Sequence, residues 1–502
     1  MRIALIPLDG RPVNWQVPQR LAEIAGVDLL VPPRAMLGTL QSGAKGMQLA
    51  KWLLASATRA GAPGLDAVVF SWDALIYGGL VQSRALDVEP HDPAALASAL
   101  GELDWSTTAG YAYITLPRLG ITVGSQDRLA THQLVREYFI ETAKAEEDPR
   151  SKERAQSLTE RLGERAVGRL WEWRERNVRL AESALRVSAQ LGLRCCHVAV
   201  EDNAESGPHL DEAARLRALA ADLHAGGAAT SFSLFDGADE AASMLLAKAY
   251  AECRELSPVA VHLMVHPPMP GADRYHGLYE THSLAEGLAF LGETLGLKLH
   301  PSEGTVRWLV VHGVQPQPDL LAADPASVFA NPYLLPAEAE GRAPIFVSDL
   351  CACNGANPNL VRHLVELAPS RIAGLVGFNT NFNSLATTAA WIRLGAGRGR
   401  SPAVRRLFVE RLADDVVYQS LARPRLLRYL AGQRLDPYDF SGANTYQLRE
   451  CLGIVERSWR DWSTGPGSAV LSACAIPSTQ AGELRFSFPW MRAFEIEAHA
   501  PP

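Results

Sequence analysis

The chain has 502 residues, of which 47% are hydrophobic and 21% charged, and its formal net charge is −7. This composition is ordinary for a soluble globular protein, and the chain is long enough to bury a large core. No basic block occurs, which argues against nucleic acid or an anionic membrane as a partner. Seven scattered cysteines without a CxxC pair argue against a disulfide framework. Without a leader-like start or a run of 18 apolar residues, we expect a cytoplasmic protein.

Short apolar segments alternate with longer segments of helical periodicity up to residue 395. Ten of the apolar segments are predicted strands: 2–8, 27–32, 67–72, 111–116, 195–200, 230–235, 259–265, 306–311, 345–349 and 372–378. Most lack polar alternation, as buried parallel strands do because helices cover both faces of their sheet. The alternation predicts an α/β fold. We expect a TIM-like (β/α) barrel with extra strands, because ten units exceed the eight of a minimal barrel. A large open sheet is the alternative.

Residues 145–192 differ from the rest, because Glu and Arg are dense and Leu, Val and Trp recur near helical spacing. We predict a long exposed helix or helix pair, an insertion that could serve as the arm of a homodimer. After Leu394 the stretch "GAGRGRSP" ends the alternation, and "GSAVLSACAIPS" with "ELRFSFPW" predicts a late hairpin. The expected domains are therefore a barrel with its insertion, 1–395, and a C-terminal α+β region, 396–502.

Polar residues follow nearly every predicted strand, at the edge where ligands bind in parallel α/β folds. The candidate site residues are Asp9, Arg11, Asn14, Arg34, Asp73, Arg118, Arg128, His132, Asp202, Asn203, Asn354 and Asn379. Any one of them could be a helix cap or a turn former. Together with nearby aromatic residues, however, carboxylates, amides and guanidinium groups suit a polyhydroxylated ligand, and the set predicts a sugar site.

Seven blocks of the sequence carry a resemblance: "PLDGRPVNW", "VPPRAMLG", "LIYGGLVQSR", "EDNAESGP", "FDGADEAASMLLA", "SDLCACNGAN" and "GFNTNFNS". They resemble, in order, an uncharacterised bacterial family of similar length, a domain of unknown function. The family more often has Asp at the positions of Gly10 and Glu201. The resemblance implies an enzyme-like polar site but no particular reaction. The chain is also similar, more weakly, to inverting exosialidases of barrel fold, in which a His is the acid and an Asp the base.

Inverting hydrolysis of a glycoside needs one group that protonates the departing oxygen and another that deprotonates a water on the opposite face. Asp9, in a loop stiffened by Pro12, is the preferred base. His132 is the preferred acid, because an imidazolium can donate a proton at mildly acid pH. Four arginines are candidates to bind a substrate carboxylate: Arg11, Arg34, Arg118 and Arg128. The sequence therefore predicts an exo-acting glycoside hydrolase without a cofactor, with an anionic sugar, a sialoside, as the expected substrate.

Three alternatives stay open. Asp9 could cap the helix near Asn14 or pair with Arg11, and a lone helical His is more often structural. A metal-dependent hydrolase could use the His-rich segment: His262, His266, His276, His282 and His312. His262 and His266, however, fall on a predicted strand, where about 3.3 Å per residue separates them by roughly 13 Å, too far to chelate one ion. A non-catalytic sugar-binding protein is the third possibility.

Overall fold

The computed structural model describes residues 1–58, 63–85, 87–267, 274–313, 315–330, 343–367, 371–399 and 401–501. Its backbone contacts divide the chain into two compact units. The first unit consists of Met1–Pro18, Gly26–Arg254 and Tyr279–His282, and the second of Gln19–Ala25, Glu255–Leu278 and Ser283–Pro502. Residues 396–502, which the sequence sets apart as a C-terminal region, lie within the second unit.

The first unit is built on a parallel sheet with the strand order β2-β1-β3-β4-β5-β6. The strands are β1 (Arg2–Ile6), β2 (Asp28–Leu30), β3 (Ala67–Ser71), β4 (Ala109–Leu116), β5 (Cys195–Val200) and β6 (Ser231–Asp236). Every residue of β1, β3, β4 and β5 is buried, which explains their unbroken apolar sequences. All six correspond to predicted strands.

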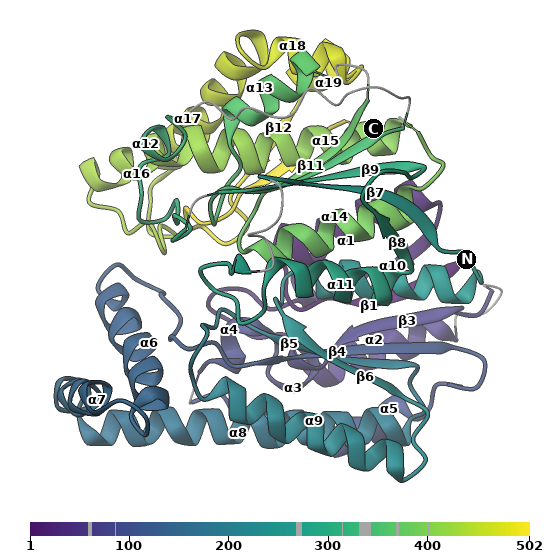
Figure 1. The fold of residues 1–502 in the computed structure, drawn as a ribbon, viewed down its shortest axis with the longest axis vertical. Helices are drawn as coiled ribbons and strands as arrows, with labels where there is room; N and C mark the ends of the chain where they lie inside the picture. The colour runs from purple at the N-terminus through teal and green to yellow at the C-terminus, as the bar shows by residue number, and fades with distance from the viewer. Residues whose placement is uncertain are drawn as a thin grey trace. The chain divides into compact units, whose positions relative to one another are not determined.

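Helices cover both faces of this sheet, as Figure 1 shows. On one face α2 (Gly46–Ala57), α5 (Pro93–Leu100), α8 (Glu164–Gln190) and α9 (His209–Ala225) share a core with the strands. On the other face α10 (Ala241–Cys253) packs on β3 and β4. Because α10 follows β6 but crosses back to the middle of the sheet, its N-terminal end lies near the centre of the carboxyl edge. Shorter helices in the connections are η1 (Arg34–Met36), α3 (Trp72–Ile76) and α4 (Leu80–Ser83).

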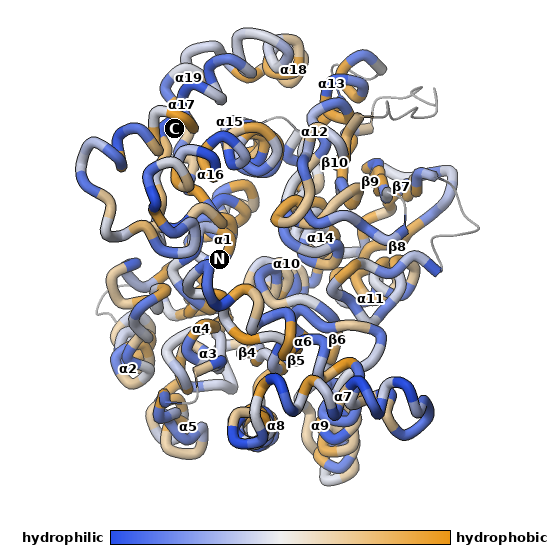
Figure 2. The backbone as a smooth tube through the Cα atoms, turned by 90° about the vertical axis from the view of Figure 1, so that its left-hand side faces the viewer, coloured by the Kyte–Doolittle hydropathy of each residue, from blue (hydrophilic) through white to orange (hydrophobic). Residues whose placement is uncertain are grey.

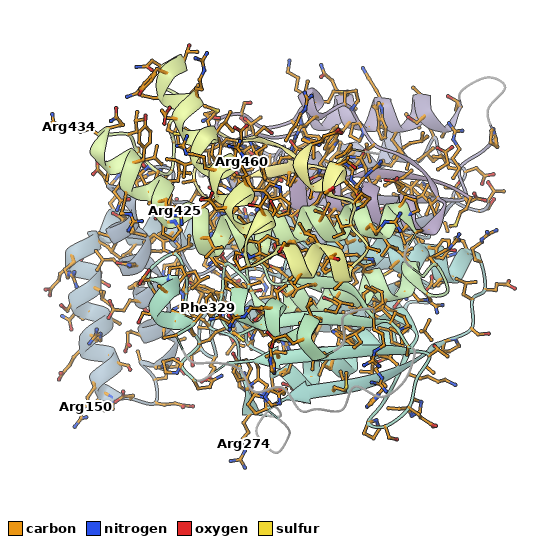
Figure 3. The ribbon with its side chains drawn as sticks, turned by 90° about the horizontal axis from the view of Figure 1, so that it is seen from above. Arg150, Arg274, Phe329, Arg425, Arg434 and Arg460 are labelled. Atoms are coloured by element: carbon orange, nitrogen blue, oxygen red, sulfur yellow. The ribbon has the colours of Figure 1, made fainter. Side chains whose placement is uncertain are left out.

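The predicted helix pair is confirmed. After α6 (Arg128–Lys144), α7 (Pro149–Leu162) and α8 fill the segment, and the three helices share a small core that includes Phe139, Leu158 and Trp173. Asp148 caps α7 by accepting a hydrogen bond from the Arg150 amide. In Figure 2 α7 is hydrophilic along most of its length, and in Figure 3 the exposed Arg150 points away from the ribbon. The role of this segment as a dimer arm stays a prediction.

The second unit also has a parallel sheet, with the order β11-β10-β9-β7-β8. Its strands are β7 (Val259–His266), β8 (Leu297–His300), β9 (Val306–His312), β10 (Ile345–Leu350) and β11 (Ile372–Val376). The helices connected to them are α11 (Leu284–Leu295), α12 (Pro325–Val328), α13 (Pro358–Leu367) and α14 (Asn381–Gly395). Every residue of α14 is buried, against β10, β11 and α11. The helix α1 (Pro12–Ala25) begins in the first unit and ends in the second.

The C-terminal part is mainly helical. A continuous helical segment comprises α15 (Pro402–Arg411), the π-helix η3 (Leu412–Ala422) and α16 (Arg423–Gly432). It is followed by α17 (Thr445–Thr464), α18 (Ser468–Ala473), α19 (Ser478–Gly482), β12 (Arg485–Ser487) and β13 (Glu497–His499). The predicted late hairpin is wrong: its first segment folds as α18, and β12 pairs in antiparallel fashion with β13 instead. The expected mixture of helices and strands in this region is present.

The α/β class, with parallel sheets flanked by helices, is confirmed, whereas a closed barrel is not. The described strand pairings make two main sheets rather than one continuous ring. In both sheets the first strand in the chain lies between the second and the third, so the chain reverses direction across the sheet at β1 and again at β7. That order is characteristic of doubly wound open sheets.

Two further expectations concern chemistry outside the sheets. None of the seven cysteines is joined in a disulfide in the structure. Within the described parts of the chain, no helix combines the length and the apolar character needed to cross a bilayer.

Candidate functional site

In open α/β sheets, ligands bind at the carboxyl edge where the strand order reverses. In the first unit this reversal lies between β1 and β3. The loop after β1 contains Asp9 and Arg11, and Asp73 stands at the beginning of α3 directly after β3. The residues just before α10 bring Asp239 to the same place, because α10 crosses back over β3 and β4. Side chains far apart in the sequence therefore meet at one edge.

Arg11 is held between two carboxylates. Its Nε donates to both oxygens of Asp9 at 3.0 Å, and its Nη2 donates to Asp9 at 2.8 Å. On the other side Nη1 and Nη2 donate to Asp239 at 2.9 and 2.6 Å. All three side chains are buried. The alternative that Asp9 pairs with Arg11 is confirmed, and because this pairing occupies the carboxylate, the geometry does not favour Asp9 as a base.

Two further predicted residues support the same loop. The buried Asn14, in the first turn of α1, donates from Nδ2 to Asp9 at 3.1 Å and to Asp239 at 3.3 Å. Arg34 donates from Nε to the Gly10 carbonyl at 2.7 Å, and its guanidinium lies 4.9 Å from the Trp15 ring centroid. Asn14 therefore holds the two carboxylates that bind Arg11, whereas Arg34 holds the backbone of the loop after β1.

Asp73 connects two strand ends. Its carboxylate accepts hydrogen bonds from the amide and the hydroxyl of Thr115, at 2.9 and 2.7 Å. Asp73 is completely buried, and this burial raises its pKa to about 7 although the bonds from Thr115 lower it. Because Asp73 has no exposed surface, its geometry favours a structural role over direct contact with a ligand.

The "YGGL" block has a steric explanation. Gly78 and Gly79 have φ values of 89° and 138°, which residues with a Cβ rarely adopt. A Cβ on Gly78 would lie 2.5 Å from the Ala44 carbonyl oxygen, and one on Gly79 would lie 3.3 Å from the Leu8 carbonyl oxygen, a tight contact. These glycines let the loop after α3 pass close to the loop after β1.

A second set of ion pairs includes one pair that reaches solvent. Arg84, the residue that follows α4, pairs with Glu201 and donates to it from Nε at 3.1 Å. Arg118 pairs with Asp202 at 2.7 Å, and these two side chains are 17% and 20% exposed, unlike those around Arg11. Burial would raise the pKa of Asp202, but Arg118 and Arg84 lower it, so the carboxylate is ionised at neutral pH. Burial followed by the charge of Arg118 lowers the pKa of Arg84.

His132 borders this second set. The half-buried side chain, on the second turn of α6, makes a hydrogen bond of 2.6 Å between Nδ1 and the Ile121 carbonyl oxygen. Burial and then the charge of Arg118 lower the pKa of His132 to about 4, while Asp202 raises it. His132 is therefore neutral at pH 7, and this state does not favour its predicted role as a general acid at neutral pH.

Asn203 belongs to a neighbouring network. Its Nδ2 donates to Asp236 at 3.0 Å, and its Oδ1 accepts a hydrogen bond of 2.8 Å from the Thr281 hydroxyl. Asp236 also accepts from the amide and from Nδ1 of His282, at 2.8 and 3.1 Å. The network holds the segment 279–282 against the ends of β5 and β6.

Three predicted residues lie apart from these pairs. Arg128 is exposed at the beginning of α6. Asn354 and Asn379 belong to the second unit, where the Asn354 amide donates to the Asn379 carbonyl at 2.9 Å. Both asparagines have positive φ, 64° and 52°. Asn354 also donates from Nδ2 to Asp319 at 2.8 Å. In the same unit, Asp415 of η3 accepts from the Gly377 amide at 3.0 Å, and burial raises its pKa to about 7 against the effect of Arg411.

The histidines of the metal alternative do not form one set. His262 and His266 lie on β7 and His312 ends β9, all in the second unit, whereas His282 belongs to the first. Among the residues that the structure describes, no three or more His, Cys, Asp or Glu side chains are grouped so that they could hold a metal ion.

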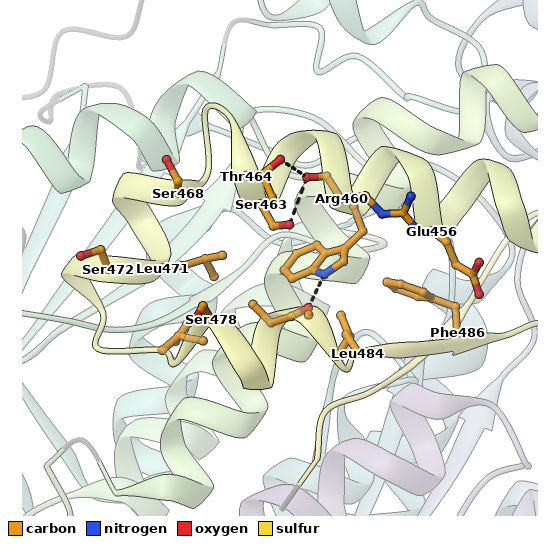
Figure 4. A pocket seen from close by; sticks show the side chains of 14 residues that line it. Glu456, Arg460, Ser463, Thr464, Ser468, Leu471, Ser472, Ser478, Leu484 and Phe486 are labelled. Atoms are coloured by element: carbon orange, nitrogen blue, oxygen red, sulfur yellow. Dashed lines mark hydrogen bonds between the residues drawn. The ribbon is translucent and has the colours of Figure 1, made fainter.

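A cavity of about 560 Å³ lies within the second unit, between α17, α18, α19 and β12, and none of the site residues named above lines it. Figure 4 shows its apolar side chains, with Leu471, Leu484 and Phe486 labelled, and its polar ones, among them Glu456 and Arg460. The Trp459 indole donates to the Ala481 carbonyl at 2.8 Å, which fixes this wall. No sequence signal pointed to this cavity.

Sequence reasoning found both partners of the pairs Asp9–Arg11 and Arg118–Asp202. It missed Asp239, which also pairs with Arg11, and both Arg84 and Glu201, which pair with each other. Arg84 ends the block "LIYGGLVQSR", and Asp239 lies in "FDGADEAASMLLA" directly after a predicted strand. Their positions within these blocks were the available signal, but the contact with a partner far along the chain was not visible.

The chain matches the model of the family described as protein of unknown function DUF4127 over residues 3–499. It therefore belongs to this family, and the family resemblance predicted from the sequence blocks is confirmed. No curated protein matches the chain.

Proposed function

We propose that this member of the DUF4127 family binds a polyhydroxylated, sugar-like ligand at the carboxyl edge of the first sheet and hydrolyses a glycosidic bond there. The observation that carries the proposal is the group formed by Arg118, Asp202 and His132. It combines a cation, an ionised carboxylate and a neutral imidazole beside one another. Such a mixture of donors and acceptors suits sugar hydroxyl groups, and it faces solvent where the pairs around Arg11 do not.

The catalytic roles follow from exposure and charge. In a single-displacement reaction the base must reach a water molecule. Asp202 is partly exposed and ionised, so we assign it the role of base in preference to Asp9. Asp9 then acts as a positioning residue, which fixes Arg11 and the loop after β1. If His132 is the acid, it must be protonated, and its pKa of about 4 confines the reaction to acid pH.

A non-catalytic sugar-binding protein is the second candidate. It is favoured by the bidentate pairing of Asp9 with Arg11, which removes the predicted base from chemistry without removing the polar edge. Binding without turnover would then depend on Arg118 and Asp202 in the same way as binding to an enzyme would.

A panel of fluorogenic glycosides, assayed between pH 4 and 8 with and without a chelator, tests the proposal. It should include sialosides, hexosaminides and neutral hexosides. We expect turnover of at least one glycoside that survives the chelator, and a loss of about 100-fold or more in kcat for Asp202→Asn. Asp104→Asn, which removes an exposed carboxylate from the same unit, is the matched control.

Three outcomes would contradict the proposal. Absence of turnover across the panel would favour the sugar-binding protein. Turnover that disappears with the chelator would favour a metal-dependent hydrolase. Full turnover by Asp202→Asn would remove Asp202 as the base.

A further inference from the structure

The ring of His132 is packed closely against Gly120 and hydrogen-bonded to Ile121. Gly120, in the loop after β4, lies directly against it: a Cβ on Gly120 would be 2.3 Å from Cε1 and 2.5 Å from Nδ1 of His132. Contacts this short do not occur between real atoms, so only glycine leaves room for the ring at its present position. The next residue, Ile121, provides the carbonyl oxygen that binds Nδ1 at 2.6 Å. Two consecutive residues therefore fix both the position and the rotation of the imidazole.

The hydrogen bond to Ile121 also determines which ring nitrogen carries the proton. A carbonyl oxygen only accepts hydrogen bonds, so Nδ1 must donate, and in a neutral imidazole the other nitrogen is then an acceptor. In the part of the chain that the structure describes, the Nε2 atom of His132 has no hydrogen-bond partner. The charged side chains that act on the ring are Arg118, Asp202 and Arg84, and burial together with the two arginines keeps the pKa of His132 at about 4.

The guanidinium groups of Arg118 and Arg84, which act on the ring, and that of Arg11 at the same sheet edge are already engaged by carboxylates. Arg118 lies 2.7 Å from Asp202 and 3.9 Å from Glu201, and Arg84 pairs with Glu201. Arg11 is bound on both sides by Asp9 and Asp239. Arg136, which also acts on Asp202, donates from Nη2 to the Asn203 carbonyl at 2.9 Å. An incoming carboxylate would therefore have to displace one of the internal carboxylates from Arg118, Arg84 or Arg11.

From this geometry we infer that His132 presents an unprotonated Nε2 to the ligand and accepts a hydrogen bond from a neutral hydroxyl group, so that the site selects an uncharged sugar or polyol over an anionic one. The inference depends on the proposed function, because it concerns the ligand of the same edge. It replaces the sialoside expected from the sequence with a neutral sugar, and it makes His132, in its neutral form, a specificity-determining residue that accepts a hydrogen bond from the ligand.

Titration calorimetry on the full chain tests the ligand class. The probes are methyl glycosides of glucose, galactose, mannose and N-acetylglucosamine, compared with N-acetylneuraminic acid, each at low and at high salt. We expect a neutral glycoside to bind with little dependence on salt and N-acetylneuraminic acid to bind at least 10-fold more weakly. His132→Leu should weaken the binding of the neutral glycoside about 10-fold. His132→Gln, which keeps an acceptor oxygen, should recover part of it. His91→Gln, at an exposed histidine of the same unit, should bind like the wild type.

Nitrogen-15 spectra of histidine-labelled protein test the protonation state independently of any sugar. The His132 signal is identified by its loss in His132→Leu. We expect the neutral form, protonated at Nδ1, from pH 5.5 to 8. An imidazolium at pH 6, or a proton on Nε2, would overturn the inference whether or not a sugar binds.

The binding data separate the remaining failures. Tighter binding of N-acetylneuraminic acid than of every neutral glycoside would overturn the inference and leave the proposed function standing. Unchanged binding by His132→Leu would do the same. If none of these sugars binds while the spectra show the expected neutral form, the proposed function fails and the ligand class assigned here fails with it.

Discussion

Replacing Asp73 with Asn should make the protein relatively more stable as the pH rises. The folded pKa of Asp73 is about 7 because the carboxyl group is completely buried, compared with 3.8 as its ordinary value. Between these two values the folded state binds a proton that the unfolded state does not. Wild-type stability therefore falls as the pH rises through this window, and it levels off above pH 7. Asparagine does not titrate, so the variant lacks this loss.

The magnitude follows from the part of the window that the experiment covers. The folded pKa of Asp73 lies about two units above pH 5, and each unit corresponds to about 1.4 kcal/mol. Between pH 5 and pH 8 the unfolding free energy of Asp73→Asn should therefore rise by about 3 kcal/mol relative to that of the wild type. Urea denaturation of both proteins at the two pH values measures this difference. Asp104→Asn is the matched control: hydrogen bonds from Ser106 and Thr107 lower the pKa of Asp104, which therefore stays ionised throughout. If the unfolding free energies of Asp73→Asn and the wild type differ by the same amount at both pH values, the pKa of Asp73 is not raised.

The other predictions concern the ion pairs and the packing around His132. Arg11→Gln leaves Asp9 and Asp239 buried without their cation and should cost about 3–5 kcal/mol in urea denaturation at pH 7; a cost under about 1 kcal/mol would contradict the pairing. Gly120→Ala places a Cβ 2.3 Å from the His132 ring and should cost about 1–3 kcal/mol by overpacking, but clearly less in a His132→Ala background; equal costs would show that the ring lies elsewhere. Because the folded pKa of His132 is lowered to about 4, its contribution to stability is present above pH 6.5 and is lost as the pH falls towards 4. His132→Gln should therefore lose less stability than the wild type between pH 6.5 and 4, and identical slopes would exclude the lowered pKa.

The strands were predictable from the sequence because burial on both faces gives them unbroken apolar segments. Their pairing was not, because alternating strands and helices produce the same one-dimensional pattern in a barrel and in open sheets. The order around β1 and β7 depends on contacts between distant segments. Among the described strands, β8 was missed because its sequence, Leu297–His300, is short and carries Lys298. The segment of α18 was misread as a strand because its few apolar residues fit either period.

The candidate site was predictable to the extent that it is local. Asp9 and Arg11 are two residues apart, and their pairing was weighed as an alternative from the sequence alone. The partner Asp239 was not predictable, because its position depends on how α10 crosses back over β3 and β4. The protonation state of His132 likewise depends on Gly120, Ile121 and Arg118 meeting around it, which no spacing in the sequence reveals.

The most direct test of the account is a crystal structure of the full chain with a bound sugar that the calorimetric or turnover panel identifies. We expect the sugar to contact Arg118, Asp202 and Nε2 of His132 at the carboxyl edge of the first sheet, with the pairing of Arg11 to Asp9 and Asp239 unchanged. A sugar bound instead in the cavity beside α17, or among the side chains around Asn354, would contradict it.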